Sequence, residues 1–161
     1  DYRGSLPLEV RHGMVSARLR LSHLSDHLGD GFALDGSGVR GEVASHEWAD
    51  LTIAAGGDFG RIYLGGGTIL HAELPVTREV LFGGFEIGSA APGFSPLLAV
   101  HWQTFGTKDF SGTLNVQAGL SFIAERRLDL VFVLTHGDNP YSQFFNRESI
   151  DLIAVELRAG L

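Results

Sequence analysis

The sequence contains no cysteine, and this absence excludes disulfide bonds and thiolate metal sites. Lysine is almost absent, because Lys108 is the only one and the other basic residues are arginines. Charged residues make up only 19% of the chain, and its net charge is −7. Phosphate binding requires a positive surface, so this charge argues against a nucleic-acid partner.

The chain also lacks any run of about 18 apolar residues, which excludes a transmembrane helix. Its mean hydropathy is nevertheless slightly positive, at +0.12. A β-barrel has this kind of composition because its apolar residues are spread over alternating positions, although a soluble all-β domain can share it. We expect a single domain over 1–161. The chain begins at Asp1 rather than Met, which we interpret as a mature product or a fragment.

The segment 112–122 carries the clearest pattern in the chain, because apolar residues alternate in it with small neutral polar ones. The apolar set is Leu114, Val116, Ala118, Leu120 and Phe122, and the polar set is Thr113, Asn115, Gln117, Gly119 and Ser121. A period of two over about ten residues predicts a strand that can cross a bilayer when tilted. The polar set is typical of a barrel lumen, since a soluble sheet usually presents charged residues to water.

Similar alternation predicts eight strands, and residues 1–12 form a leading segment or the remnant of a preceding strand. The predicted strands are 13–24, 39–56, 61–72, 80–88, 97–104, 112–123, 128–136 and 149–159. The predicted connections differ in length: 25–38 and 137–148 are long, whereas 57–60 and 124–127 are short. Both long ones fall at one end of the sheet, which is typical of outer-membrane barrels.

We therefore predict an all-β fold, an antiparallel up-and-down β-barrel of about eight strands or part of a larger barrel. Its location would be the bacterial outer membrane, its partner membrane lipid, and its role structural, binding or pore-related, with no cofactor. Charges of both signs on the polar faces predict a lumenal network, formed by Arg18, Arg20, Arg40, Glu42 and Glu86. A soluble ligand-binding barrel or a β-sandwich would show the same periodicity with its apolar faces turned inward.

His23 and Ser25 are candidates for catalysis, because residues two apart share one face of a strand. By parity they lie on the apolar face, at the loop end of the first predicted strand. A histidine that takes the serine proton beside bound lipid would suit a lipid-acting serine hydrolase. A third group must orient the histidine, and parity selects none of the carboxylates nearby in sequence, which are Asp26, Asp30, Asp35 and Glu42. Turn or interface residues would give the same pattern.

The same segment offers an alternative reading as a metal site. His23, Asp26, His27 and Asp30 all carry metal-ligating groups, but they match no strong ligand-spacing motif. We therefore expect no bound metal.

Two blocks of the sequence resemble a bacterial family known as domain of unknown function 1207. Residues 18–30, ending in Ser-His-Leu-Ser-Asp-His-Leu-Gly-Asp, resemble its His-x-Ser-Ser-His-Leu-Gly-Asp block, which includes His27 and Asp30. Residues 137–145 resemble its Gly-x-x-Pro-x-Gly-Gln-Phe block through Pro140, Gln143 and Phe144, with Ser142 in place of a glycine. The resemblance implies an outer-membrane β-barrel with further strands upstream and no known reaction.

A looser likeness links His23 and Ser25 to outer-membrane phospholipase A and lipid A deacylases. These enzymes carry a His-x-Ser pair on the outer face of a barrel strand and an orienting residue on the next strand. The Asn-Gly that commonly follows their serine is Asp26-His27 here.

Overall fold

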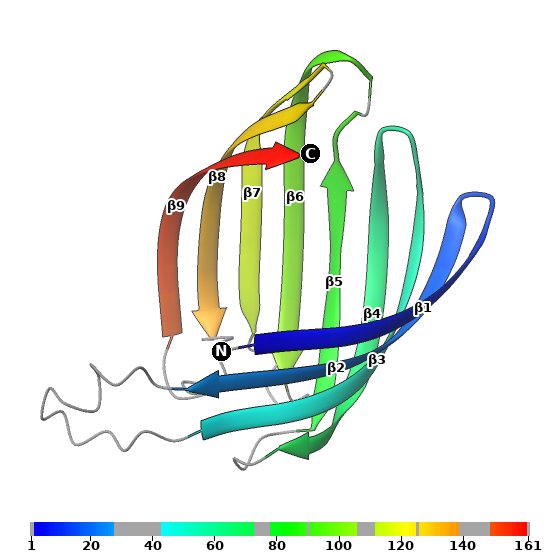
Figure 1. Cartoon of the computed structure of the whole chain (residues 1–161), viewed down its shortest axis with the longest axis vertical. Helices are drawn as coiled ribbons and strands as arrows, with labels where there is room; N and C mark the ends of the chain where they lie inside the picture. The colour runs from blue at the N-terminus through cyan, green and yellow to red at the C-terminus, as the bar shows by residue number, and fades with distance from the viewer. Residues whose placement is uncertain are drawn as a thin grey trace, which may run out of the picture.

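The computed structural model describes residues 2–27, 43–72, 78–89, 91–105, 112–124, 126–138 and 149–160. These residues form nine β-strands in one antiparallel sheet, with each strand paired to the next along the chain (Figure 1). The strands are β1 (Tyr2–His12), β2 (Val15–His27), β3 (Val43–Gly57), β4 (Gly60–Ala72), β5 (Glu79–Ile87), β6 (Gly93–Phe105), β7 (Thr113–Ile123), β8 (Arg127–Asp138) and β9 (Ser149–Gly160). No helix in these ranges is long and apolar enough to span a membrane.

The all-β, up-and-down prediction is confirmed, but the sheet has nine strands rather than eight. The additional strand is β1, which occupies the segment predicted to be a leading segment or the remnant of a preceding strand. It pairs with β2 over its whole length, from Tyr2 opposite Ser25 to His12 opposite Val15. Pro7 lies within β1, and proline is tolerated there because an edge strand has one unpaired side.

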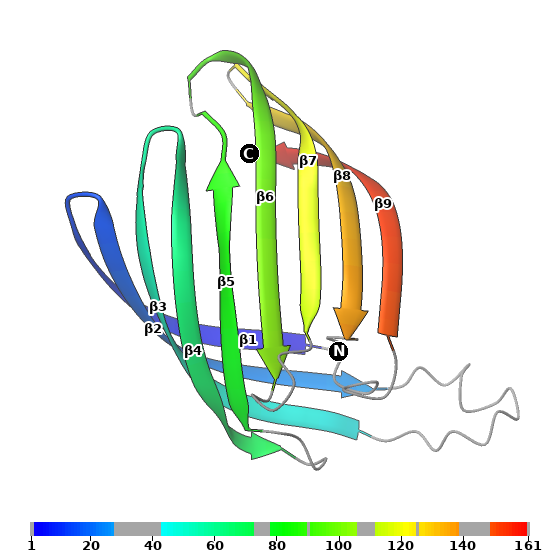
Figure 2. The ribbon, with the colours of Figure 1, turned by 180° about the vertical axis from the view of Figure 1, so that it is seen from behind.

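The sheet curls strongly but is not closed. Among the described residues, β1 pairs only with β2 and β9 only with β8, so both edges lack a second partner. Figures 1 and 2 show that curling brings β1–β3 across from β6–β8, with a concave side between them. The predicted barrel is therefore present as an open, curved wall.

The connections follow the predicted asymmetry in length: the four at one end of the sheet are short, and the four at the other end are longer. The short ones are 13–14, 58–59, 88–92 and 124–126, and the longer ones are 28–42, 73–78, 106–112 and 139–148. Because neighbouring strands are antiparallel, all short connections lie at one end and all longer ones at the other (Figure 1).

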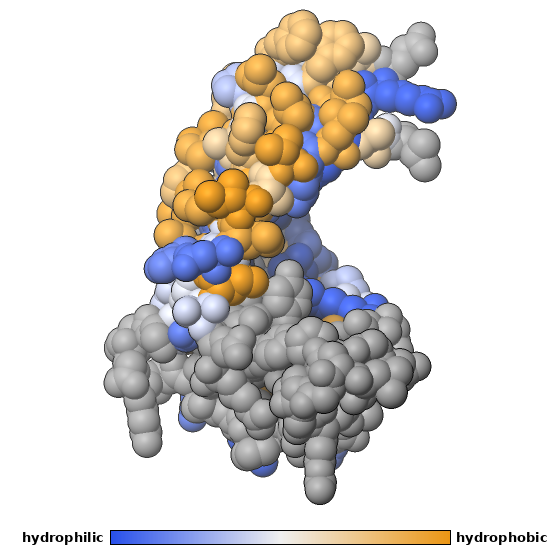
Figure 3. Space-filling view, turned by 90° about the vertical axis from the view of Figure 1, so that its left-hand side faces the viewer, coloured by the Kyte–Doolittle hydropathy of each residue, from blue (hydrophilic) through white to orange (hydrophobic). Residues whose placement is uncertain are grey.

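The two faces of the wall have opposite character. Leu114 and Leu120 are 37% and 55% exposed, whereas Asn115 and Gln117 line a cavity on the concave side. The same division holds in the neighbouring strand, where Leu130 and the alternate apolar residues that follow it are exposed. In Figure 3, which views the wall from the side of β9, hydrophobic residues gather over its outer surface. Apolar residues thus point outward, and most inward positions are polar or small.

The concave side also holds apolar residues, namely Val131 and Val133 of β8 and a small internal cluster. Trp48, Ile69, Val80 and Phe82 are buried together, next to a run of glycines in β4. Gly67 lies against the backbone of β3, because a Cβ atom at this position would sit 2.2 Å from the carbonyl oxygen of Ala49. The cluster and the close strand approach thus depend on glycine having no side chain.

Gly67→Ala is expected to destabilise the fold by about 1–3 kcal/mol, because the added methyl group forces β3 and β4 apart. Urea unfolding, followed by the far-ultraviolet signal of the sheet, measures this loss. Gly4→Ala is the matched control, since a Cβ atom on Gly4 of β1 meets nothing within 4 Å. Equal unfolding free energies for the two variants would contradict this packing.

Candidate functional site

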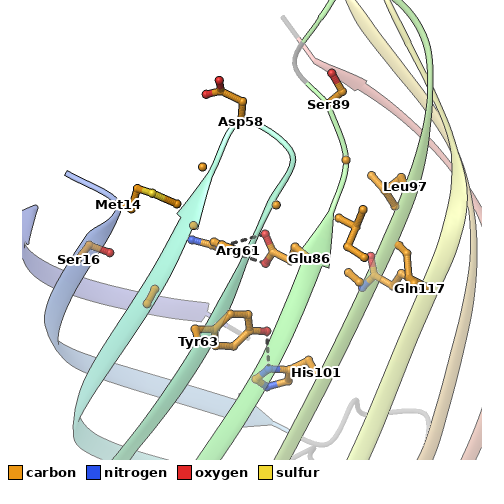
Figure 4. Close-up of a pocket in the computed structure, with 18 of the residues that line it drawn as sticks. Met14, Ser16, Asp58, Arg61, Tyr63, Glu86, Ser89, Leu97, His101 and Gln117 are labelled. Atoms are coloured by element: carbon orange, nitrogen blue, oxygen red, sulfur yellow. Dashed lines mark hydrogen bonds and ion pairs between the residues drawn. The ribbon is translucent and has the colours of Figure 1, made fainter. Parts of the chain in front are cut away.

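The concave face holds a polar cavity of about 620 Å³ towards the short-connection end of the sheet (Figure 4). Inward residues of β4, β5 and β6 form its wall, because directly opposite residues in neighbouring strands share a face. Arg61 binds Glu86 through two hydrogen bonds of 2.9 Å, from Nε and from the second guanidinium nitrogen. Tyr63 and His101 are joined at 2.9 Å between the phenol oxygen and Nδ1.

The amide and hydroxyl groups of β7 and β8 continue this polar lining. Asn115 donates to Thr135 at 2.7 Å, and Gln117 donates to Asn115 at 2.8 Å. These inward residues form a connected hydrogen-bond network rather than an apolar core, and such networks hold polar side chains in fixed positions.

A second polar group lies between β2 and β3. Asp50 is 2% exposed and accepts hydrogen bonds from Arg20 at 2.9 Å and from the Trp48 indole nitrogen at 3.1 Å. Pairing a buried carboxylate with a guanidinium offsets the cost of removing its charge from water. Both donors reach the same oxygen, Oδ2, whereas Oδ1 is buried with no partner among the described residues.

The lumenal charges predicted from sequence are arranged differently from the expected single network. Arg20 pairs with Asp50, and Glu86 pairs with Arg61. Arg18 lies on the same inward face, but no carboxylate within the described ranges pairs with it, and its Nε atom is buried without a partner. Arg40 and Glu42 lie outside the described residues.

The outer face carries a histidine–carboxylate pair at the long-connection end. His23 of β2 is directly opposite Glu47 of β3, and its Nδ1 lies 3.0 Å from a carboxylate oxygen of Glu47. Both side chains are partly exposed, at 34% and 41%. Ser25 follows on the same face and is 6% exposed. A serine, a histidine and a carboxylate that orients the histidine are the three roles of a nucleophilic triad.

A similar pair stands on the outer face at the other side of the sheet. His136 of β8 is opposite Asp151 of β9, with 2.6 Å between Nδ1 and a carboxylate oxygen. The residue two positions after His136 is Asp138, so this pair has no serine in the place that Ser25 takes. It provides an internal comparison for His23 and Glu47.

The remaining predicted motif residues are not located by the structure. His27 is the last residue of β2, and only its backbone position is described. Asp30, Pro140, Gln143 and Phe144 lie outside the described residues. In the part of the chain that is described, no three His, Asp or Glu residues come together in a way that could hold a metal ion.

Sequence reasoning missed several residues of these groups, among them Glu47, Asp50 and Arg61. A signal for Glu47 existed, because it shares the parity of Leu51 and Ile53 and therefore the apolar face of β3. The register that sets it opposite His23 is fixed by the strand pairing, which the sequence does not specify.

These features define a class: an up-and-down antiparallel β-sheet with an apolar convex face and a polar concave face. Comparison with protein families identifies the chain more closely. It belongs to the family described as "Protein of unknown function (DUF1207)", whose sequence model matches residues 1–160. Neither a curated protein nor a solved structure matched the chain.

Proposed function

We propose that the chain forms the wall of an outer-membrane β-barrel in a Gram-negative envelope. Its convex face would contact lipid acyl chains, and its concave face would line a polar lumen. The observation that carries this proposal is an apolar band around the convex face with a polar boundary at the long-connection end.

The band is clearest in β8 and β9. Four successive outward positions of β8, from Leu128 to Leu134, are exposed apolar residues, and His136 follows them. At about 3.3 Å per residue these positions extend over about 20 Å of strand, which approaches the ~25 Å apolar height of outer-membrane barrels. In β9, Asp151 precedes the exposed Ile153 in the same way.

The polar boundary of the apolar band continues on β2 and β3. In β2 the exposed Leu19 and Leu21 are followed by His23, and in β3 Glu47 stands at the same level because it pairs with His23. Charged groups are costly at the centre of a bilayer and far less so at its surface. Within the described strands, the outward carboxylates lie at one end of the band, and this supports an orientation with the longer connections at one membrane surface.

Charge on the concave side argues against the soluble barrel. A soluble barrel buries its apolar faces and exposes its polar ones, whereas Arg61, Glu86 and Asp50 point inward here. The exposed apolar residues cover a continuous surface of a size that soluble monomers rarely present to water.

The two tryptophans allow a direct test of this arrangement. Trp48 lies on the concave face, and Trp102 lies on the convex face, directly opposite the exposed Leu114. In vesicles of lipids with brominated acyl chains, bromine is expected to quench the fluorescence of Trp102 in a Trp48→Phe variant. The same lipids should leave Trp48 largely unquenched in a Trp102→Phe variant.

Quenching of Trp48 with no effect on Trp102 would reverse the two faces and overturn the proposal. Ready solubility of the folded protein without detergent, together with a lack of quenching in both variants, would also contradict it. Heat-dependent migration on gels, as folded outer-membrane barrels show, gives an independent readout of the folded state.

A second candidate function is hydrolysis of lipid acyl esters at the outer face. The specific observation that favours it is the contact between His23 and Glu47 on the same face as Ser25. The Ser25 oxygen would attack the ester carbonyl and His23 would accept its proton, which gives an acyl–serine ester and releases the alcohol. Water would then release the fatty acid and restore the serine.

A further inference from the structure

A second cavity on the concave face is strongly basic, although the protein as a whole is acidic. Its volume is about 540 Å³. Four arginines line it, namely Arg3, Arg18, Arg20 and Arg61, against the single carboxylate of Glu86. The whole chain carries a net charge of −7, so this concentration of positive charge is local.

Two of the four arginines are already neutralised. Arg61 is bound to Glu86, and Arg20 is bound to Asp50. Arg3 and Arg18 remain, and within the described ranges neither forms an ion pair. Glu9 is opposite Arg18 in the β1–β2 pairing, but it lines the other cavity.

The surroundings of Arg18 contain polar atoms without partners. The Nε atom of Arg18 is buried, and no described residue accepts its hydrogen bond. Thr52, directly opposite it in β3, has a buried hydroxyl that also lacks a partner in the described structure. Burying a polar group without a hydrogen bond is costly, and an acceptor bound in the cavity would remove that cost at Arg18, which lines it, but not at Thr52, which does not.

Apolar and aromatic side chains form part of the remaining wall, beside the polar groups of His46, Tyr63, His101 and Gln103. Leu24, Val80, Phe82 and Trp48 contribute to its wall, and the Arg3 guanidinium lies over the Trp48 ring, 5.3 Å from its centroid. A ligand that fits must therefore combine an anionic head with an apolar body. A guanidinium presents a planar fork of donors that matches a carboxylate.

We propose that this cavity, named here the Arg3–Arg18 cavity, binds a small organic carboxylate. Its carboxylate group pairs with Arg18 and Arg3, and its apolar body lies against Val80 and Phe82. This site is on the opposite face from His23 and Ser25, so it is independent of any lipid hydrolysis.

Benzoate and its neutral counterpart benzamide provide the test. In a Trp102→Phe background, Trp48 is the only tryptophan and reports on the cavity from within its wall. Titration of the folded protein with benzoate is expected to change Trp48 fluorescence to saturation. Benzamide, which has the same shape without the charge, should bind at least about tenfold more weakly, since ionised hydrogen bonds are about twice as strong as neutral ones.

Arg18→Gln is expected to weaken benzoate binding by at least about tenfold while leaving benzamide unchanged. Arg158→Gln is the matched control, because Arg158 lines the first cavity and pairs with Glu156. Phenyl phosphate replaces benzoate in a third titration, and tighter binding of it would show that the site selects phosphate rather than carboxylate. Equal affinities for benzoate and benzamide, or benzoate binding unaffected by Arg18→Gln, would overturn the proposal.

Discussion

Leu130→Arg is expected to destabilise the protein in a lipid bilayer by about 2–4 kcal/mol, the cost of arginine at the membrane midplane of a barrel. Leu130 lies in the middle of the apolar band of β8. Its partners across the strands, Leu120 and Leu157, are exposed on the same face. An arginine there must reach water through hydrocarbon or disturb the lipid around it. Equilibrium unfolding from phospholipid vesicles by urea measures the loss.

The control is the same substitution at the end of the same face. His136→Arg lies at the polar boundary of the band, where arginine costs only about 0–1 kcal/mol. If both variants lost the same stability, or if Leu130→Arg were neutral in vesicles, the convex face would not be in contact with hydrocarbon.

Ser25→Ala has the largest expected effect on activity, if the outer face hydrolyses lipid esters. Loss of the nucleophile in a triad lowers kcat by roughly a thousandfold or more. The assay is release of fatty acid from phospholipid vesicles that contain the folded protein. Activity that is the same in the wild type and in Ser25→Ala would exclude Ser25 as the nucleophile.

Glu47→Gln tests whether the pair of His23 and Glu47 serves catalysis or only the polar boundary of the apolar band. Glu47 holds His23 from the neighbouring strand, so its loss is expected to lower kcat at least about tenfold with little change in KM. Asp151→Asn is the matched control, because it breaks the equivalent contact to His136, whose own strand carries Asp138 rather than a serine two positions further on. Equal losses in the two variants would indicate that both pairs serve only the membrane boundary.

The order of the strands and the face to which each side chain points were predictable from the sequence, because the alternation of apolar and polar residues is a local property. The apolar and polar sets of 112–122 keep their sides in β7, and the short and long connections keep their ends. β1 was less apparent, although Leu6, Leu8 and Val10 alternate within it. Pro7 weakens a strand assignment unless the strand is known to lie at an edge, and that is a property of the whole sheet.

Partners across strands were not predictable in the same way. Residues on β2 and β3 were assigned to the correct faces, yet the contacts of His23 with Glu47 and of Arg20 with Asp50 depend on the register. A shift of two residues would preserve every face and change every pair. The length of the 28–42 connection allows several registers, so the orienting carboxylate was sought among residues near in sequence instead.

The described residues form an odd number of strands, and this has a consequence for how the wall can close into a cylinder. Successive strands alternate in direction, so β1 and β9 run the same way. If β1 and β9 of one chain paired directly, they would form a parallel pair. A second copy with its longer connections at the same end of the sheet would also pair in parallel, because its β1 would lie beside β9. An antiparallel seam at both edges needs an odd number of additional strands between β9 and β1, which makes the total even, as in bacterial single-chain outer-membrane barrels.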